Sequence, residues 1–245
     1  MFSLREVLTV ICVTVLVMTM YGCNETDDGS SRYVKSSYVI PTPTSTPFSP
    51  EILLEESGMV MSTLNSFRFD LYHKSGVTIL LPNLFMENAQ GYVVKPDKMT
   101  VQFTGTFGSF AIKSSLIAMG NESYMTNPVT GNWEAMQKKA SPLGFFDPLG
   151  GITSIMLFID DVFMLDNDDE IYVLQGVLAT EHLSSLVGDT LKGGMVDLEI
   201  KIYSDTKYLV EAVIAGKIMP DDPDGIVRVI TLSEFNEPVT IESPK

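Results

Sequence analysis

Apolar and polar residues alternate along several stretches of this chain of 245 residues. An alternation with a period of two is typical of a strand that buries one face and exposes the other. The clearest alternating runs lie at residues 67–74, 99–107, 110–118 and 196–203. Turn-forming sequences separate the runs, such as Lys95-Pro96-Asp97 and the DDPDG sequence at 221–225. The pattern predicts an antiparallel meander with one apolar face.

Three other stretches repeat their apolar residues every three or four positions, which is the period of a helix. The first is expected over residues 49–66, because Ser49 is an N-cap candidate and Pro50 suits the first helical position. The second is expected over residues 150–164, GGITSIMLFIDDVFM, and a short third helix over residues 180–187. This order of helices and strands predicts an α+β fold, in which a curled antiparallel sheet wraps around a few helices.

The chain begins with a different pattern. A short polar start precedes an apolar run at residues 7–21, which is short for a membrane span and typical of a secretory signal. The run ends in Gly22-Cys23, and a small residue before a cysteine is typical of a bacterial lipoprotein signal. We therefore expect residues 1–22 to be a signal peptide and Cys23 to be lipidated. An ordinary signal peptide or an anchor helix that contains a cysteine is the alternative interpretation.

Residues 23–48 follow as a tether. They are rich in Ser, Thr and Pro and hold few large apolar side chains, so they are expected to be disordered. The two cysteines of the chain are Cys12, inside the apolar run, and Cys23. The mature chain is therefore expected to fold without a disulfide, and residues 49–245 are expected to form one domain.

The net charge of the chain and the absence of known motifs argue against several classes of function. The formal net charge of −15 argues against a nucleic-acid partner, which requires a basic surface. The two histidines, His73 and His182, have no metal-ligand spacing, and the acidic run at 166–170 lacks the glycine and the terminal glutamate of a calcium loop. We therefore expect no catalytic residue, no metal and no cofactor, and the protein is not expected to be an enzyme.

Several short sequences, taken in their order and spacing, resemble one known family. They are Gly91 to Met99 (GYVVKPDKM), Tyr124 with Gly131-Asn132-Trp133, the Phe146-Asp147-Pro148 turn, and the C-terminal run from Asp221. The folded body is similar over its whole length to the LppX/LprA/LprF/LprG family of bacterial envelope lipoproteins. The resemblance implies a LolA-like half-barrel with an apolar cavity that binds an acylated lipid or glycolipid for carriage across the cell envelope. It also implies a place on the outer face of the cytoplasmic membrane, with a membrane lipid transporter as a possible partner.

The alternation and the helical spacing together predict which residues line such a cavity. The wall is expected to consist of Val101, Phe103, Ile112, Leu116, Val196, Leu198 and Ile200 from the strands, and the lid of Ile155, Met156 and Ile159 from the helix. The 14 methionines suit an irregular apolar site, since their side chains are flexible. A filled core would give the same alternation. In that case the protein would be a surface-displayed structural or protein-interaction lipoprotein.

Overall fold

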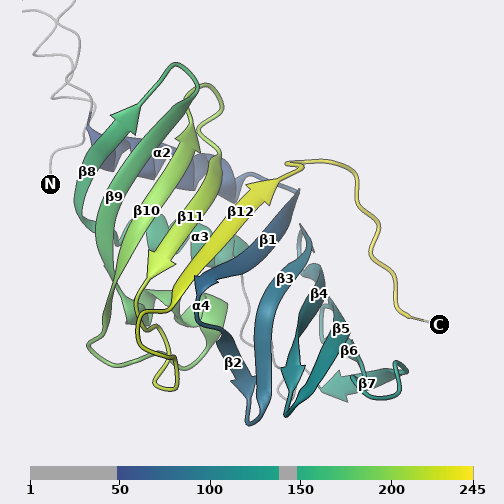
Figure 1. Cartoon of the computed structure of the whole chain (residues 1–245). Helices are drawn as coiled ribbons and strands as arrows, with labels where there is room; N and C mark the ends of the chain where they lie inside the picture. Colours follow the sequence, from purple (N-terminus) through teal and green to yellow (C-terminus); the bar gives the residue numbers. More distant parts are fainter. Residues whose placement is uncertain (1–48, 138–147, 245) are drawn as a thin grey trace, which may run out of the picture. The chain divides into compact units, whose positions relative to one another are not determined.

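The computed structural model describes residues 49–137 and 148–244 (Figure 1). All described residues belong to one compact unit, residues 47–245. The predicted signal peptide, the lipidation site Cys23 and the predicted tether therefore lie outside the described residues. Among the helices of the described ranges, none combines the length and the apolar composition that crossing a membrane requires.

The described part of the chain forms one antiparallel sheet of 12 strands. Its strands are β1 (Ser66–Ser75), β2 (Thr78–Leu81), β3 (Leu84–Val94), β4 (Lys98–Phe107), β5 (Phe110–Met119), β6 (Glu122–Thr126), β7 (Trp133–Gln137), β8 (Asp160–Asn167), β9 (Ile171–Ala179), β10 (Met195–Tyr203), β11 (Leu209–Ala215) and β12 (Val227–Ser233). Their order is β7-β6-β5-β4-β3-β1-β12-β11-β10-β9-β8, with β2 paired to β3 beside this path. The sheet curls without closing, because β7 and β8 are its two ends (Figure 1).

Short helices cover one face of the curled sheet. They are α2 (Pro50–Ser62), α3 (Pro148–Met156), the 3-10 helix η2 (Thr180–Leu183) and α4 (Ser184–Val187). Figure 1 shows α2 and α3 behind strands β8–β12, and α3 packs against α2, η2 and α4. The hydroxyl of Thr153 in α3 donates to the carbonyl oxygen of Gly58 in α2 over 3.3 Å. The predicted α+β class, with a curled antiparallel sheet around a few helices, is confirmed.

The predicted helix boundaries need two corrections. Ser49 caps α2, since its side chain accepts a hydrogen bond from the backbone N–H of Ile52, but α2 ends at Ser62 and not near residue 66. The helix expected over residues 150–164 ends at Met156, and residues 160–167 form strand β8. Asp161 has a φ of +51°, which no right-handed helix contains. Because apolar residues fill 162–165 without a break, their pattern fits either element, and pairing with β9 decides for the strand.

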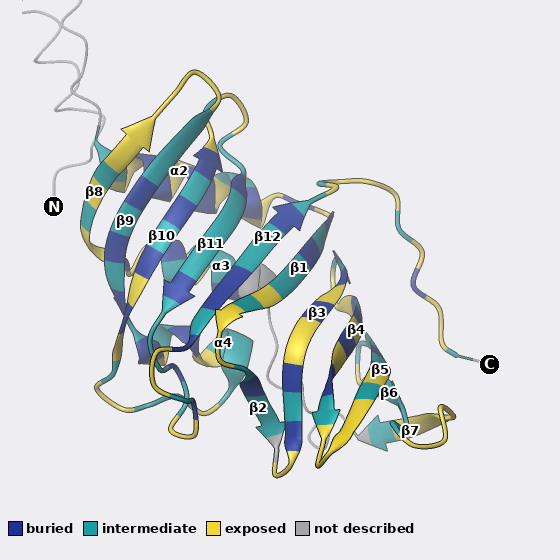
Figure 2. Cartoon of the chain, in the orientation of Figure 1, coloured by how far each residue is buried: buried dark blue, intermediate teal, exposed yellow. Residues whose placement is uncertain are grey.

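The register of the strands places apolar side chains on the same face from one strand to the next. Leu71 of β1 pairs with Ile230 of β12 on one side and with Ala89 of β3 on the other. The row continues from Ile230 through Ala212 of β11 to Ile200 of β10. Figure 2 shows the resulting alternation of buried and exposed residues along β10. The helices therefore cover a continuous apolar face.

Two glycines test this register and the helix packing. A Cβ atom on Gly91 in β3 would lie 1.8 Å from the carbonyl oxygen of Thr100 in β4, so Gly91→Ala must displace the backbone of a paired strand. We expect it to lower the free energy of unfolding by about 3 kcal/mol. In α2, a Cβ on Gly58 would lie 3.6 Å from Cβ of Met156, an ordinary contact, so Gly58→Ala should raise the stability by about 0.5–1 kcal/mol.

Urea denaturation of the two variants beside the unchanged protein measures both effects. Each variant adds one methyl group at a glycine, so the pair is matched in chemistry. A Gly91→Ala variant as stable as the unchanged protein would contradict the close approach of β3 and β4.

Candidate functional site

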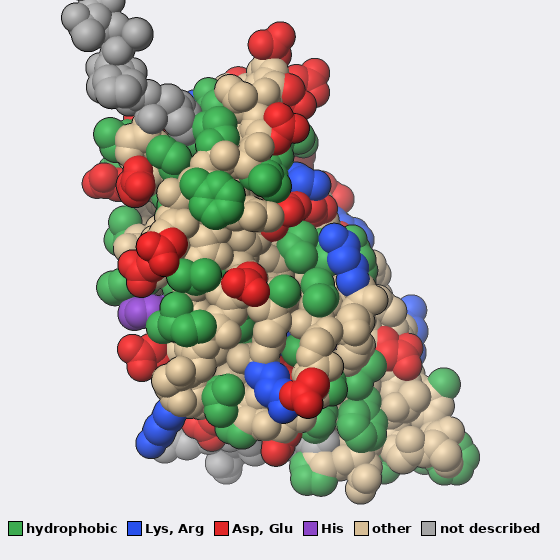
Figure 3. Space-filling view, turned by 60° about the vertical axis from the view of Figure 1, so that its left-hand side comes forward, with side chains coloured by type: hydrophobic (Ala, Val, Ile, Leu, Met, Phe, Trp, Pro, Cys, Tyr) green, Lys and Arg blue, Asp and Glu red, His purple; other side chains and the backbone are tan. Residues whose placement is uncertain are grey.

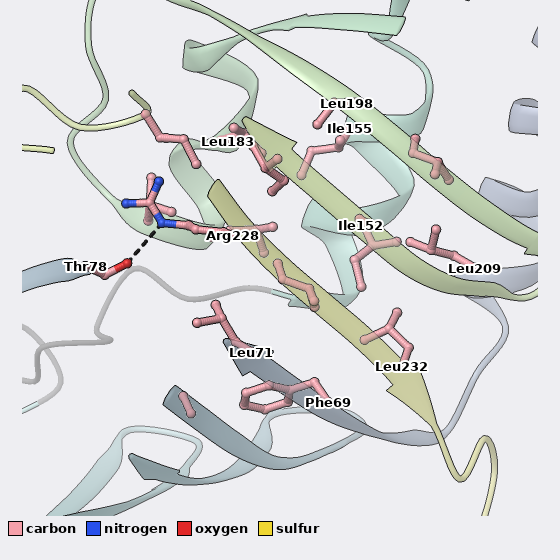
Figure 4. A pocket seen from close by; sticks show the side chains of 18 of the residues that line it. Phe69, Leu71, Thr78, Ile152, Ile155, Leu183, Leu198, Leu209, Arg228 and Leu232 are labelled. Atoms are coloured by element: carbon pink, nitrogen blue, oxygen red, sulfur yellow. Dashed lines mark hydrogen bonds between the residues drawn. The ribbon is translucent and has the colours of Figure 1, made fainter. Parts of the chain in front are cut away.

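A cavity of about 220 Å³ lies between the apolar face of the sheet and the helices. Its described lining is apolar except for Thr78 and Arg228. The lining residues are Phe67, Phe69, Leu71, Thr78, Ile79, Leu80, Met86, Ala89, Val101, Ile152, Ile155, Met156, Ile159, Leu183, Leu186, Val187, Leu198, Ile200, Leu209, Ala212, Ile214, Ile218, Met219, Arg228, Ile230 and Leu232. Figure 4 shows side chains from the strands and from the helical segments converging on this space.

Six of the ten residues predicted to line a cavity do border this one. They are Val101, Leu198 and Ile200 from the strands, and Ile155, Met156 and Ile159 from α3 and the residues after it. The lid residues lie there because α3 presents positions three and four apart to the sheet. Whether these residues contact a lipid stays a prediction.

The other four, Phe103, Ile112, Leu116 and Val196, do not line the cavity, which corrects their expected place. Phe103 and Leu116 are buried on β4 and β5, and Ile112 is half-buried against the same core. Val196 is 2% exposed, and a Cβ on Gly216 would come within 3.3 Å of its Cγ1. These residues have the alternation of a wall but belong to parts of the hydrophobic core that do not border the cavity.

Nine of the 20 remaining lining residues come from three strands that the cavity prediction did not use. They are β1, β11 and β12, whose inward residues are Phe67, Phe69, Leu71, Leu209, Ala212, Ile214, Arg228, Ile230 and Leu232. The alternation of β1 was visible in the sequence, and only its position in the middle of the sheet was not. Arg228 gave no sequence signal, because an arginine in an alternating run is expected on the exposed face.

Arg228 belongs to a buried polar cluster at one end of the cavity. Its side chain extends from β12 toward Thr78 of β2 (Figure 4), and its Nε donates to the Thr78 hydroxyl oxygen over 3.0 Å. Its Nη2 donates to Oδ1 of Asp222 over 2.5 Å. Arg228 is 3% exposed and Asp222 2%, so the ion pair is buried. Buried ion pairs recover the cost of desolvation only when further hydrogen bonds complete them.

Asp222 has these further bonds. Its Oδ2 accepts hydrogen bonds from the backbone N–H groups of Ile218 and Met219, at 2.9 and 3.0 Å. The carboxylate therefore holds together the turn between β11 and β12 while it neutralises the guanidinium. On Arg228, by contrast, Nη1 is buried and has no hydrogen-bond partner among the described residues.

His73 completes the cluster and fixes the direction of its hydrogen bonds. It pairs with Arg228 across β1 and β12, and its Nδ1 lies 2.7 Å from the carbonyl oxygen of Glu87. A carbonyl only accepts, so Nδ1 carries the proton, and neutral Nε2 accepts from the Thr78 hydroxyl at 2.8 Å. Desolvation, together with the nearby positive charge of Arg228, lowers the pKa of His73, although the bond to Glu87 acts in the opposite direction.

No arrangement of three or more His, Cys, Asp or Glu side chains that could hold a metal ion occurs in the described ranges. The acidic residues at 166–170 lie at the exposed end of β8 and in the turn that follows, where Asp168 accepts hydrogen bonds from the backbone N–H groups of Glu170 and Ile171. These carboxylates shape a turn.

The lowered pKa of His73 predicts how stability depends on pH. Since the folded state binds the proton more weakly than the unfolded state, the neutral form contributes its full stabilisation above the ordinary value of 6.5. That stabilisation is lost as the pH falls from 6.5 through the lowered pKa. We expect the melting temperature of the protein to fall as the pH is lowered below 6.5, and to fall by more than that of a His73→Gln variant.

Thermal melts of the two proteins at and below pH 6.5 check the direction of this change. The variant is a control for the carboxylates that titrate at lower pH, because both proteins contain them. Equal pH dependence of the two would contradict the neutral His73 in the cluster.

Comparison with known proteins identifies the fold. Neither the protein-family models nor the curated proteins gave a match to the sequence. Among solved structures, LprF from Mycobacterium bovis superposes with a TM-score of 0.60 at 17% identity, over 80% of this chain and 96% of LprF. LppX from Mycobacterium tuberculosis superposes with a TM-score of 0.52 at 15% identity, over 79% of this chain and 98% of LppX. The chain therefore has the fold of LprF and LppX, and the resemblance seen in the sequence is confirmed at the level of the fold.

Proposed function

We propose that this protein is a lipid-anchored protein of the bacterial cell envelope that binds an acylated lipid or glycolipid in its cavity and carries or presents it. One observation carries the proposal: the described residues enclose a cavity of about 220 Å³ whose lining is apolar except for Thr78 and Arg228. Core packing normally leaves few voids larger than a water molecule. A space of this size and chemistry suits an acyl chain.

The size of the cavity limits how much of a lipid it holds. An apolar cavity of about 150 Å³ accepts one benzene molecule, so by proportion 220 Å³ takes a chain segment of about nine carbons. At about 0.8 kcal/mol per buried methylene, that segment contributes about 7 kcal/mol to binding. In this conformation the cavity volume therefore fits part of one acyl chain, and a displacement of α3 from the sheet would supply space for a longer or second chain.

The end of α3 has the surface expected of such a lid. Leu157 and Phe158 follow its last residue and are exposed. The ring of Phe158 stacks on the ring of His182 in η2, with 4.0 Å between the ring centroids. Ile155 and Met156, directly before them, line the cavity. A short displacement of this segment would expose the lining to an entering chain while the sheet keeps its register.

A second candidate function has support from the edge of the sheet. Phe163 and Leu165 on β8 are each 51% exposed, and β8 ends the sheet. Figure 3, turned to bring this side forward, shows hydrophobic side chains between acidic ones. An exposed apolar edge strand suits a protein partner, as in the surface-displayed interaction lipoprotein. Native mass spectrometry of residues 47–245 produced in bacteria distinguishes the two functions, because only a lipid carrier retains lipid.

The membrane anchor rests on Cys23, which lies outside the described residues. If Cys23 is acylated, Cys23→Ser should move the protein from the membrane fraction to the soluble fraction, and the unchanged protein should carry the mass of an acylated cysteine. Fractionation followed by mass spectrometry of the N-terminal peptide measures both. A protein that stays with the membrane and has no acyl mass would refute lipidation.

Two residues on β10 test the cavity itself. Leu198 and Val196 point to the same face, at 5% and 2% exposure, but only Leu198 lines the cavity. We expect Leu198→Trp to fill the space, to abolish lipid retention and to change the melting temperature little. The matched Val196→Trp places the same ring in a filled region and should cost about 3 kcal/mol or more. Native mass spectrometry and thermal melts of both variants give the readouts.

Full lipid retention by a folded Leu198→Trp variant would show that lipid binds elsewhere. Unfolding of both variants to the same extent would show that Leu198 is ordinary core.

A further inference from the structure

Arg228 carries a buried hydrogen-bond donor that no described residue accepts. Its Nε and Nη2 have partners in Thr78 and Asp222, but Nη1 has none. Buried polar groups in proteins are almost always hydrogen-bonded, and an unpaired donor on a charged group is costly. Because Arg228 lines the cavity, an oxygen atom of a bound ligand is in a position to remove this cost.

The charge of the cluster selects the kind of oxygen. The carboxylate of Asp222 already lies 2.5 Å from Nη2, so the guanidinium is neutralised before any ligand binds. A second anion would leave two negative charges against one positive charge in a buried site, in a protein whose net charge is −15. An uncharged oxygen, such as the carbonyl of an ester, accepts the hydrogen bond from Nη1 without adding charge.

The position of Arg228 also sets the direction of the ligand. Arg228, Ile230 and Leu232 follow one another on the cavity face of β12, which spans about 13 Å at the usual rise of a strand. Figure 4 shows Arg228 at one end of the labelled side chains and Leu209 with Leu232 at the other. The cavity therefore has one polar end and one apolar end.

The donor is also held in place before a ligand arrives. Thr78 accepts from Nε of Arg228 and donates to His73, whose other nitrogen is fixed on the carbonyl oxygen of Glu87. Asp222 fixes Nη2 from the other side. Because the other polar side-chain atoms of the cluster already have hydrogen-bond partners, the guanidinium is held in a defined orientation. Nη1 therefore loses little conformational freedom when a ligand binds.

We propose that the cavity takes an uncharged acyl ester, whose carbonyl oxygen accepts a hydrogen bond from Nη1 of Arg228 and whose chain lies along β12 toward Leu232. This inference rests on the proposed function and adds a chemical class to it. The preferred ligand is an acyl ester, in preference to a free fatty acid or an ether-linked lipid.

Three probes with the same chain length test the class: monolauroylglycerol, its ether analogue monododecylglycerol, and ionised laurate. Isothermal titration calorimetry on the purified protein at pH 8 gives the three affinities. We expect monolauroylglycerol to bind roughly tenfold or more tightly than the ether, which lacks the carbonyl acceptor. Laurate is also expected to bind more weakly, because its charge is added beside Asp222.

Variants of the protein test whether Arg228 causes the preference for the ester over the ether. Arg228→Lys keeps a positive charge beside Asp222 and removes Nη1, so the advantage of the ester over the ether should disappear while a thermal melt shows a folded protein. Arg68→Lys is the matched control, since Arg68 is ion-paired with Asp70 away from the cavity lining, and it should leave all three affinities unchanged. Asp222→Asn removes the neutralising charge and should shift the preference toward laurate.

The outcomes separate this inference from the proposed function. If the protein binds none of the probes, the proposed function itself is wrong. If it binds the ester and the ether equally, or binds laurate most tightly, the cavity is a lipid site but the inference about the ester is wrong. If a folded Arg228→Lys variant keeps the full preference for the ester, the acceptor does not bind at Nη1.

Discussion

The pairing of β1 with β12 is the interaction on which the rest of the structure depends. It joins strands from the two ends of the described chain, and it connects β3–β7 on one side to β8–β11 on the other. Its register places Phe69 beside Leu232 and Leu71 beside Ile230, all four of which line the cavity. A shift of one residue would turn these side chains to the outer face. The apolar interior and the cavity therefore exist only in this register.

The same pairing accounts for the buried polar cluster. It brings His73 opposite Arg228, and the short strand β2 adds Thr78 between them. A buried ion pair contributes little net stability, and apolar side chains of similar size would often serve as well. The cluster is therefore better explained by the donor that it holds at the cavity, Nη1 of Arg228, which no described residue accepts, than by its effect on folding.

Much of the fold could be predicted from local patterns, because the spacing of apolar residues and the capping of helices involve only residues close together in the sequence. Ser49 with Pro50 marked the start of α2, and the alternation at 196–203 marked β10. The end of α3 could not be predicted, since apolar residues at 162–165 satisfy both periods and only pairing with β9 selects the strand. Alternation identified Val196 and Leu198 equally, yet whether an inward residue meets packed atoms or open space depends on contacts far along the chain. The inward position of Arg228 could not be predicted either, because it depends on contacts with Asp222 and Thr78.

The central claim is that an acyl chain binds inside the domain, between the sheet and α3. Nuclear Overhauser contacts between a bound monolauroylglycerol chain and isotope-labelled Leu and Ile methyl groups test it most directly. The account predicts contacts to the methyl groups of Ile155, Ile200 and Ile230 in the cavity, and none to the exposed Leu157 and Leu165. Contacts confined to exposed methyl groups would contradict it, because they would place the lipid on the surface of the domain.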